Sequence, residues 1–480
     1  MISEDEKEDV PSIPVDEPSL TTREKLNPSN TNLVTSVLND ASSRPSILYF
    51  LPLFYAFLCM GLGTGITSST LLKLGEQTNS TTNQLTSIFF TRSCGYFAGI
   101  TAAGFLIDRY QDLGSLFLAI AIFLMSIVTL WVPFIYRLIL LLPLQLMWGI
   151  AAGFLDNVDQ VLTMRYYSKH NVGPYLQALQ SAFGIGAFVS PLIVAQFSSK
   201  KPQSQNQWHY AYFIVFLLHL PNVIWLLYHG IRNECGKKTE TKNTVSTEPE
   251  NEEFLNTNHS VYDHSNIDQI KAKRMHRQLL FVLSLAPFLF CYVGGQYGFI
   301  SYLNTYATLK MGLSTEIAAY LNSAFWACLV AGPLSAIVCS LKFSPHIMVF
   351  GNLICCTASL ILLLLFYNST FVLWFGSMIF AFSIASIYSS TITYAKGHIT
   401  MTGKRLSILI IAATLGDATV PLLVGITLNS TIFAYPTFII VILFIMILAS
   451  MIFTANVLCF LSRTKSSLHA DDIIFKNHNS

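Results

Sequence analysis

The chain has 480 residues, of which 52% are hydrophobic and only 11% are charged. Soluble globular domains carry about 25% charged residues, so this composition excludes an ordinary soluble fold. The formal net charge of +2 is too small to indicate a nucleic-acid partner. Eight of the nine cysteines lie in apolar segments and none forms a CxxC pair, so we expect neither a disulfide framework nor a metal site.

Residues 1–45 are polar and begin with an acidic run, which predicts a disordered tail rather than a secretory signal. Beyond this tail, twelve apolar runs are long enough to cross a hydrocarbon core about 30 Å thick. They cover residues 46–71, 85–107, 113–135, 138–164, 175–197, 209–231, 278–308, 315–341, 346–366, 371–395, 406–428 and 434–460. The sequence therefore predicts an all-α polytopic membrane protein with twelve transmembrane helices.

The predicted helices form two groups of six. An N-terminal bundle covers 46–231, a polar linker covers 232–277, a C-terminal bundle covers 278–460, and a polar tail follows at 461–480. Two six-helix bundles joined by a linker are typical of the major facilitator fold, in which the solute site lies at the midplane between the halves.

Lysine and arginine accumulate on the cytoplasmic side of membrane proteins and set their orientation. With a cytoplasmic N-terminus, the inner segments hold 22 of the 28 Lys and Arg residues and the outer loops hold five. We therefore expect cytoplasmic termini, a cytoplasmic linker and a plasma-membrane location. The basic end of the linker fits a positive-inside anchor or a contact with anionic lipids. We expect glycosylation at Asn79, whose sequon lies in an outer loop.

A short motif follows the second helix and reads Gly104-Phe-Leu-Ile-Asp108-Arg109. It resembles the G-x-x-x-D-R signature of the major facilitator superfamily at its expected place. A glycine lets two helices approach closely, and a carboxylate at the membrane edge is stabilised beside a helix N-terminus. The alternative is an ordinary charged loop. We interpret Gly104, Asp108 and Arg109 as gating or structural residues.

Further motifs narrow the resemblance to the sodium-dependent glucose transporter 1 family, which is also called major facilitator superfamily domain-containing protein four and is distantly similar to fucose permeases. The motifs, in chain order, are Arg92-Ser-Cys-Gly95-Tyr96-Phe-Ala-Gly99, Gly153-Phe154-Leu155-Asp156, Gly173-Pro174-Tyr-Leu-Gln177-Ala-Leu-Gln180, Ala319-Tyr320-Leu321-Asn322-Ser323-Ala-Phe325-Trp326 and Leu415-Gly416-Asp417. The resemblance implies a solute carrier with a sugar-like cavity, and Na⁺ or H⁺ as the coupling ion.

Several polar positions depart from the pattern of that family. The departures are Val158 for Gly, Gln160 for Asn, Gln180 for His, Gln296 for Glu, and Gly332-Pro333 for Gly-Arg. A Glu-to-Gln change removes a titratable group and a hard anionic oxygen, which are the means of coupling to H⁺ or Na⁺. We therefore expect transport that depends only weakly on Na⁺ and pH, and no other cofactor.

The fourth predicted helix carries a polar cluster inside the membrane. Asp156 and Gln160 are four residues apart and share a helix face, and Asn157 and Asp159 flank them. Ionisable groups inside the membrane are costly and usually face the bundle interior or water. We interpret Asp156, Asn157 and Gln160 as solute-binding, with Asp156 lining the cavity or bonding another helix. Asp159 is nearer the cytoplasmic end, and hydration there is its simplest interpretation.

Three other helices offer neutral polar groups. Gln177, Gln180, Ser181 and Gly184 form one stripe on the fifth helix, which predicts either a cavity lining or interhelical hydrogen bonds. The glycine-rich seventh helix adds Gln296, Tyr297 and Tyr302. On the eighth helix, Asn322 and Trp326 are four residues apart, which suits a sugar ring that stacks on an indole while amides bond its hydroxyls; plain packing is the alternative for Trp326.

Arg92 and Asp417 are expected to lie at similar depths in the second and eleventh helices, which pack together across the halves in the fold that the resemblance implies. An ion pair between them would link the halves when the outer side is closed and break when that side opens. The alternatives for Arg92 are an extended side chain that reaches the outer surface, or a contact with Glu76.

These observations predict a transporter of a small polar solute, a hexose-like sugar or a polyol, that works by alternating access as a monomer in the lipid bilayer. A transporter-like sensor or scaffold without transport activity is the alternative. No nucleophile–base pair is visible in the sequence, so we do not expect an enzyme.

Overall fold

The computed structural model describes residues 47–80, 82–197, 207–244, 263–429 and 437–478. The predicted N-terminal tail and the central part of the linker lie outside these described residues. Within them the chain is helical and contains no strand. An α-helix pairs its backbone groups within the segment, which hydrocarbon requires because it offers no hydrogen-bond partners.

The first half contributes seven helices. They are α2 (Ile47–Ser69), α3 (Leu71–Thr78), α4 (Thr82–Arg109), α5 (Gly114–Trp131), α6 (Leu138–Tyr166), α7 (Gly173–Phe197) and α8 (His209–Thr244). The second half contributes α9 (Asp263–Leu309), α10 (Thr315–Lys342), α11 (Pro345–Leu365), α12 (Thr370–Ile384), α13 (Ile387–His398), α14 (Gly403–Asn429) and α15 (Thr437–His478).

Eleven helical segments of the described chain are long and apolar enough to cross a membrane. They correspond to eleven of the twelve predicted runs, with α12 and α13 forming one span over Thr370–His398. The remaining run is α4, which forms the expected helix but begins with polar residues and carries Arg92. The all-α polytopic fold is therefore confirmed, and α4 is the predicted span that falls outside the eleven segments.

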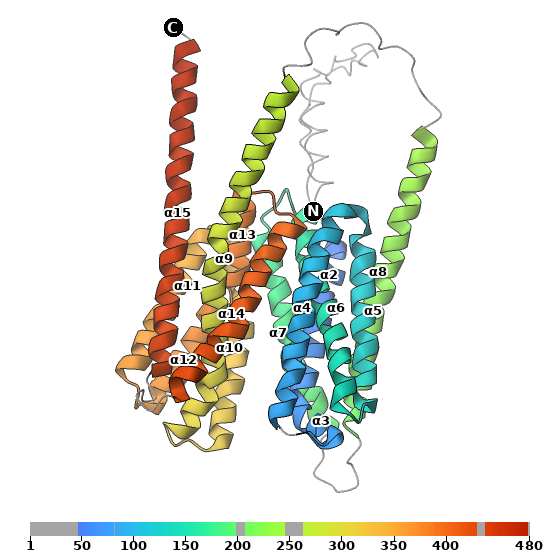
Figure 1. The fold of residues 1–480 in the computed structure, drawn as a ribbon, viewed down its shortest axis with the longest axis vertical. Helices are drawn as coiled ribbons and strands as arrows, with labels where there is room; N and C mark the ends of the chain where they lie inside the picture. Colours follow the sequence, from blue (N-terminus) through green and yellow to red (C-terminus); the bar gives the residue numbers. More distant parts are fainter. Residues whose placement is uncertain (1–46, 81, 198–206, 245–262, 430–436, 479–480) are drawn as a thin grey trace, which may run out of the picture. The chain divides into compact units, whose positions relative to one another are not determined.

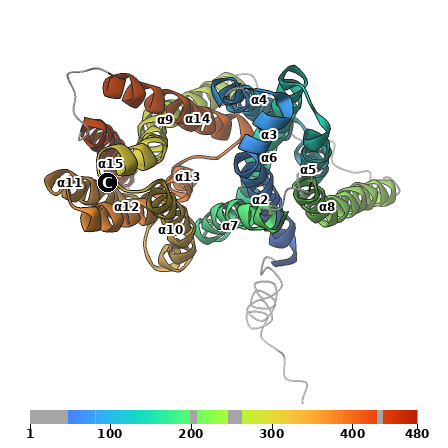
Figure 2. The ribbon, with the colours of Figure 1, turned by 90° about the horizontal axis from the view of Figure 1, so that it is seen from below.

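The helices of each half pack mainly with one another. In the first half α4 packs on α6, α2 on α7, and α5 on α6 and α8, while in the second half α9 packs on α14 and α15 and α11 on α12. Across the halves, α7 meets α10 and α13, and α4 meets α14 (Figure 2). We call the end where α8 finishes and α9 begins the linker side, and the end that carries α3 the far side (Figure 1).

Many serine and threonine hydroxyls inside the spans bond a carbonyl oxygen of their own helix. The hydroxyls of Ser126 and Thr129 in α5 donate to the carbonyl oxygens of Ile122 and Met125, at 2.7 and 2.8 Å. Such a bond to the carbonyl four residues earlier lets a hydroxyl enter hydrocarbon without a partner on another helix. Buried polar atoms that lack this solution therefore point to a site.

The contact between α4 and α6 depends on glycines that let the two backbones touch. A Cβ atom at Gly99 would collide with the carbonyl oxygen of Ile150, and one at Gly149 would collide with that of Arg92. Small residues allow this close approach of two helices. In membranes, helix association is driven by van der Waals packing, because lipid tails are as apolar as the side chains and leave no hydrophobic driving force.

We expect Gly99→Ala to destabilise the protein, because the added methyl group must push α4 away from α6. Overpacking of this kind costs about 1–3 kcal/mol, which should lower the midpoint of thermal unfolding in detergent. Gly351→Ala in α11 is the matched control, since a Cβ atom there meets nothing within 4 Å. Equal melting temperatures for the two variants would contradict the prediction.

Candidate functional site

A cavity of about 820 Å³ lies between the two halves. It is lined by residues of α2, α4, α6 and α7 from the first half and of α9, α13 and α14 from the second. Its lining includes Ser68 near the end of α2, Phe90 near the start of α4 and Leu422 in the later part of α14, so it reaches toward the far side. The volume falls within the range of about 300–1,000 Å³ that is typical of small-molecule sites.

One wall of the cavity is an arginine stacked on an indole. The guanidinium carbon of Arg92 lies 3.2 Å from the centre of the Trp148 ring. The guanidinium also lies 3.5 Å from the carbonyl oxygen of Gly63 and 3.4 Å from the hydroxyl of Thr64, both on α2. Arg92 is only 8% exposed, so these neutral contacts and the ring hold its charge inside the bundle.

Asp156 on α6 lies at the cavity wall between two helices. The hydroxyl of Tyr96 on α4 donates to one carboxylate oxygen at 2.6 Å, and the amide of Gln160 donates to the other at 2.9 Å. Gln160 also lies 3.3 Å from the hydroxyl of Tyr388 on α13. Asp156 therefore both lines the cavity and bonds another helix, and it begins a polar chain that crosses to the second half.

The second half and α7 add neutral polar groups to the same cavity. Gln180, Gln296 and Tyr297 line it, as the sequence predicted, and so does Asp417 on α14. Gln180 and Gln296 are partly exposed. Amide side chains in such a position can donate to and accept from a ligand hydroxyl.

Six of the predicted solute-binding residues are not part of this lining. The buried amide of Asn157 lies 2.9 Å from the Ser407 hydroxyl on α14, and the amide of Gln177 donates to the carbonyl oxygen of Ser386 at 3.0 Å. The Tyr302 hydroxyl donates to the carbonyl oxygen of Pro421 at 3.1 Å. The others are Gln160, which lies behind Asp156, and Asn322 and Trp326 on α10.

Four of these residues share a helix with cavity residues but face another direction, whereas Asn322 and Trp326 lie on α10, which contributes no residue to the lining. Asn157 follows Asp156 by one residue, and a step of one residue turns a helix by about 100°. The side chain of Asn157 therefore meets α14 while that of Asp156 meets the cavity. Asp159, for which we expected hydration, is fully buried, with an exposed fraction of 0%.

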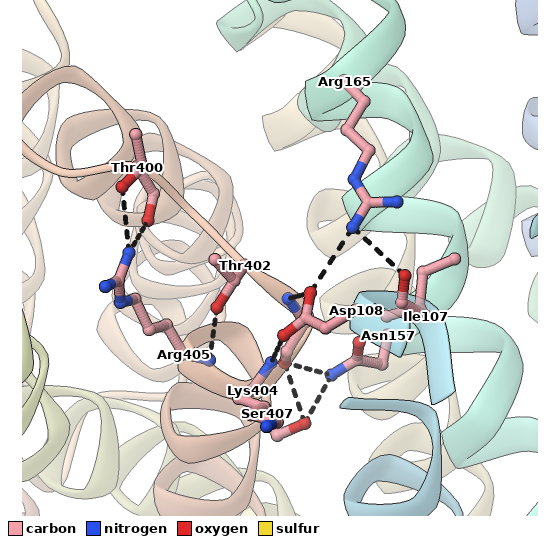
Figure 3. Close-up of polar contacts among 10 residues, drawn as sticks. Ile107, Asp108, Asn157, Arg165, Thr400, Thr402, Lys404, Arg405 and Ser407 are labelled. Carbon is pink, nitrogen blue, oxygen red and sulfur yellow. Dashed lines mark hydrogen bonds and ion pairs between the residues drawn. The ribbon is translucent and has the colours of Figure 1, made fainter. Parts of the chain in front are cut away.

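On the linker side the halves are joined by Asp108 (Figure 3). Its carboxylate accepts from the backbone N–H groups of Gly403 at 2.8 Å and Lys404 at 3.0 Å, which begin α14. The first N–H groups of a helix have no partner within it, so an anion there is stabilised by hydrogen bonds and by the helix dipole. The side chain of Arg165 on α6 lies 3.4 Å from the same carboxylate. This is the geometry that the sequence predicted for an aspartate at this edge.

The other two residues of the signature have different surroundings. A Cβ atom at Gly104 would collide with the hydroxyl oxygen of Ser407, so this glycine sets the approach of α4 to α14. The side chain of Arg109 is exposed, and the ion pair that Asp108 forms within the described chain is with Arg165.

More contacts close the linker side. The amide of Asn171 donates to the carbonyl oxygen of Ser340 at 2.6 Å, and Lys396 donates to that of Tyr167 at 3.4 Å. Each bond joins one half to the other. The cavity is therefore sealed from the linker side while it reaches toward the far side, which is one of the two states that alternating access requires.

The expected pair between Arg92 and Asp417 is not formed in this state. Both side chains line the cavity, but Arg92 is held by Trp148 and α2. Because the pair was expected only when the far side is closed, it stays a prediction for that state. Arg92 takes up neither alternative: it lies inside the bundle, and Glu76 instead pairs with Lys73 at 3.4 Å.

The sequence interpretation missed three side chains of the site. Trp148, rather than Trp326, is the indole of the cavity, and Tyr96 and Tyr388 bond its polar wall. Trp148 precedes Asp156 by eight residues and Ala152, which also lines the cavity, lies midway between them. Extending the Asp156 stripe by two turns of the helix would have found Trp148.

We expect Asp108→Asn to open the linker side, because an amide places a donor against the N–H groups of α14. Charge-assisted hydrogen bonds contribute about 1.5–3 kcal/mol each, so the population closed on this side should fall by about tenfold or more. Distances between spin labels at positions 169 and 342 would measure this shift. Arg109→Gln, at an exposed neighbour, should leave the distances unchanged; a shift of equal size there would count against a specific role for Asp108.

Asn79 is exposed at the far side, where it ends α3 in a left-handed conformation with φ of 51°. Its exposure is compatible with the predicted glycan, which stays a prediction.

Comparisons with known proteins agree with this architecture. The sequence pattern of the Major Facilitator Superfamily matches residues 53–421. Among curated relatives, sodium-dependent glucose transporter 1 of Xenopus laevis is 26% identical over 388 residues, which cover 76% of this chain and 72% of the relative. Major facilitator superfamily domain-containing protein 4A of Danio rerio is 25% identical over 455 residues, which cover 83% of this chain and 86% of that one.

Solved structures show the same fold at low sequence identity. A variant of the E. coli fucose:proton symporter FucP superposes with a TM-score of 0.66 at 15% identity, covering 86% of this chain and 99% of FucP. The proton:xylose symporter XylE, bound to 6-bromo-6-deoxy-D-glucose, superposes with a TM-score of 0.63 at 14% identity, covering 84% of this chain and 94% of XylE. With its twelve-helix fold and a matching pattern over most of its length, the chain belongs to the Major Facilitator Superfamily.

Proposed function

We propose that this protein transports a small neutral sugar or polyol by alternating access. The observation that carries the proposal is the cavity between the halves, whose lining combines the Trp148 indole and the Arg92 guanidinium with two carboxylates and two amides. The apolar face of a sugar ring stacks on an aromatic plate, and its hydroxyls bond amides and carboxylates. Several curated relatives carry the name sodium-dependent glucose transporter, which supports the same solute class.

Each lining group has a distinct part in this proposal. Trp148 meets the solute from the first half with the part of its ring that Arg92 leaves uncovered, and Asp156 accepts hydrogen bonds from solute hydroxyls beside it. Gln296 and Tyr297 approach from α9 in the second half, and Gln180 from α7. A solute held by both halves stabilises a closed cavity. The binding energy of the solute thereby drives the change from a cavity open on one side of the membrane to one open on the other.

We also propose that the linker side is cytoplasmic and that the protein resides in the plasma membrane. The bias of Lys and Arg supports the orientation, because positively charged loops are retained in the cytoplasm. In this orientation the described state faces outward. Closure of the far side would then bring Arg92 toward Asp417, while the contacts of Asp108 with α14 would break.

Counterflow of radiolabelled D-glucose in proteoliposomes is the direct test. Vesicles preloaded with unlabelled glucose should transiently accumulate the label, with no need for an ion gradient. Thermal unfolding with added sugars gives a second readout, since a ligand at 100 times its Kd stabilises the folded state by about 2.7 kcal/mol. Stabilisation without counterflow would support the alternative, a sensor that binds but does not transport.

We expect Trp148→Ala to weaken sugar binding more than Trp326→Ala. Removal of the indole takes away the stacking surface and the ring that holds Arg92, and aromatic contacts contribute about 0.5–1.5 kcal/mol beyond the area they bury. Trp326 does not line the cavity, so its removal changes packing alone. The sugar concentration for half-maximal counterflow measures the difference. The reverse order would show that α10, rather than α6, supplies the plate.

We expect D-glucose uptake to change by less than about twofold when Na⁺ is replaced by choline. Gln180 and Gln296 offer neutral oxygens to the cavity, which bind Na⁺ more weakly than a carboxylate does. Initial uptake rates at matched ionic strength and pH give the comparison. A loss of most of the uptake in choline would show instead that Asp156 or Asp417 holds Na⁺ with the solute.

A further inference from the structure

Asp159 is a carboxylate that the structure leaves without a partner. Both of its oxygens are buried and neither has a hydrogen-bond partner within the described chain. The residue is completely buried, with an exposed fraction of 0%, in the part of α6 between the cavity and the linker side. An ionised carboxylate in such a place costs several kcal/mol, so the group must be neutralised or reached by water.

Two hydroxyls continue from Asp159 along the same stripe of α6. Thr163 and Tyr167 follow at intervals of four residues, and the exposed fractions of these residues are 0% and 1%. Their hydroxyl oxygens are also buried and without a partner in the described part of the chain. Four residues of helix advance by about 6 Å, so the three groups are spaced along the helix axis toward the linker side.

The stripe joins the cavity to the linker side. Asp156, three residues before Asp159, lines the cavity. At the other end Tyr167 follows the last residue of α6, its ring stacks on Tyr175 at 3.8 Å, and Lys396 of the second half donates to its carbonyl oxygen. The contact with Lys396 is one of those that must break when the linker side opens.

Among the described residues, no charged group bonds Asp159. The packed helices α2, α4, α5, α7 and α14 surround α6, and α5 contains no titratable side chain. The titratable or charged side chains of the others are Tyr49, Tyr55, Cys59, Arg92, Cys94, Tyr96, Asp108, Arg109, Tyr175, Lys404, Arg405 and Asp417. In the described structure none of these bonds to Asp159, and the charge that acts on it is that of Asp156.

A proton satisfies this environment better than Na⁺ does. One proton neutralises a carboxylate and needs no further ligands, whereas a metal cation bound by oxygens needs several at once. The stripe offers Asp159 and a single hydroxyl four residues away, with the like charge of Asp156 on the other side. Unpartnered buried hydroxyls are also groups that internal water molecules commonly bridge.

We propose that Asp159 is the proton-binding residue of this transporter, and that Thr163 and Tyr167 mark a water-bridged route by which its proton reaches the linker side. The step is a simple ionisation: the O–H bond of the Asp159 carboxyl breaks, the proton passes to water, and the carboxylate keeps the electron pair. Release occurs when the linker side opens and water can solvate the carboxylate. The solute and the proton thus occupy separate sites on α6.

This inference rests on the proposed function and changes one expectation. Because Gln180 and Gln296 are neutral, we expected the rate of transport to depend only weakly on pH as well as on Na⁺. The unpartnered carboxyl supplies a titratable group from α6 instead, so uptake should respond to a proton gradient even though the cavity amides cannot.

Infrared spectroscopy of the purified protein tests the proton site without any solute. At neutral pH the wild type should show the carbonyl stretch of a protonated carboxyl group, and Asp159→Asn should lose that component. Asp156→Asn should keep it, because Asp156 has two hydrogen-bond donors that stabilise its ionised form. The proposal is overturned if the wild type lacks the band, which is the result that bound Na⁺ would produce. It is also overturned if the band is unchanged in Asp159→Asn. If Asp159→Asn does not fold, Asp159→Glu should shift the band, and an unmoved band overturns it equally.

Proteoliposome flux tests the route. For each variant, the rate of D-glucose uptake driven by a pH gradient is divided by the rate of D-glucose counterflow in the same preparation. This ratio should fall in Thr163→Val and Tyr167→Phe, which remove only the hydroxyls. Thr129→Val is the matched control, because that buried hydroxyl is already bonded within α5. Equal ratios in all variants overturn the route. Absence of D-glucose counterflow from the wild type would count against the proposed sugar function, and the infrared result would still decide the proton site.

Discussion

Hydrocarbon offers no hydrogen-bond partners, and this constraint explains most of the polar arrangement of the protein. Polar groups inside the bundle meet the constraint in different ways. The hydroxyls of Ser126 and Thr129 bond their own helix, and Asn157 and Gln177 bond the opposite half. Others, such as His219 and Asn222, bond a neighbouring helix of the same half. Asp156 lines the cavity, and Asp159 has no hydrogen-bond partner among the described residues.

The two sides of the membrane differ in how the halves are joined. On the linker side, backbone donors and acceptors meet charged or amide side chains, as with Asp108 at the start of α14. Such bonds depend on exact placement of a helix end and are lost together when the halves rotate. On the far side, the described lining of the cavity mixes aromatic and apolar residues such as Phe90 and Leu422 with polar ones such as Ser68. A polar contact on one side and a wide cavity on the other are the physical basis of a two-state carrier.

Separation of solute and proton has a structural reason in α6. Asp156 faces the cavity and accepts hydrogen bonds from Tyr96 and Gln160, whereas Asp159 is turned into the packed bundle, where neither of its oxygens has a hydrogen-bond partner among the described residues. Two carboxylates on adjacent turns thus have opposite environments. The first environment suits a solute ligand and the second suits a proton site, as proposed.

The sequence by itself determined where the helices lie along the chain and predicted the place of the Asp108 carboxylate beside a helix N-terminus. These depend on hydrophobic length and local charge, which a chain expresses without its partners. Tertiary structure alone decided which stripe of each helix faces the cavity. Asn157 and Gln177 are as polar as Gln180, but helix rotation directs them to the other half; Trp148 rather than Trp326 lines the cavity because α10 contributes no residue to the lining. The rotation of each helix about its own axis depends on close packing of segments that are distant in the sequence, such as Gly99 against Ile150. No local sequence pattern encodes this packing.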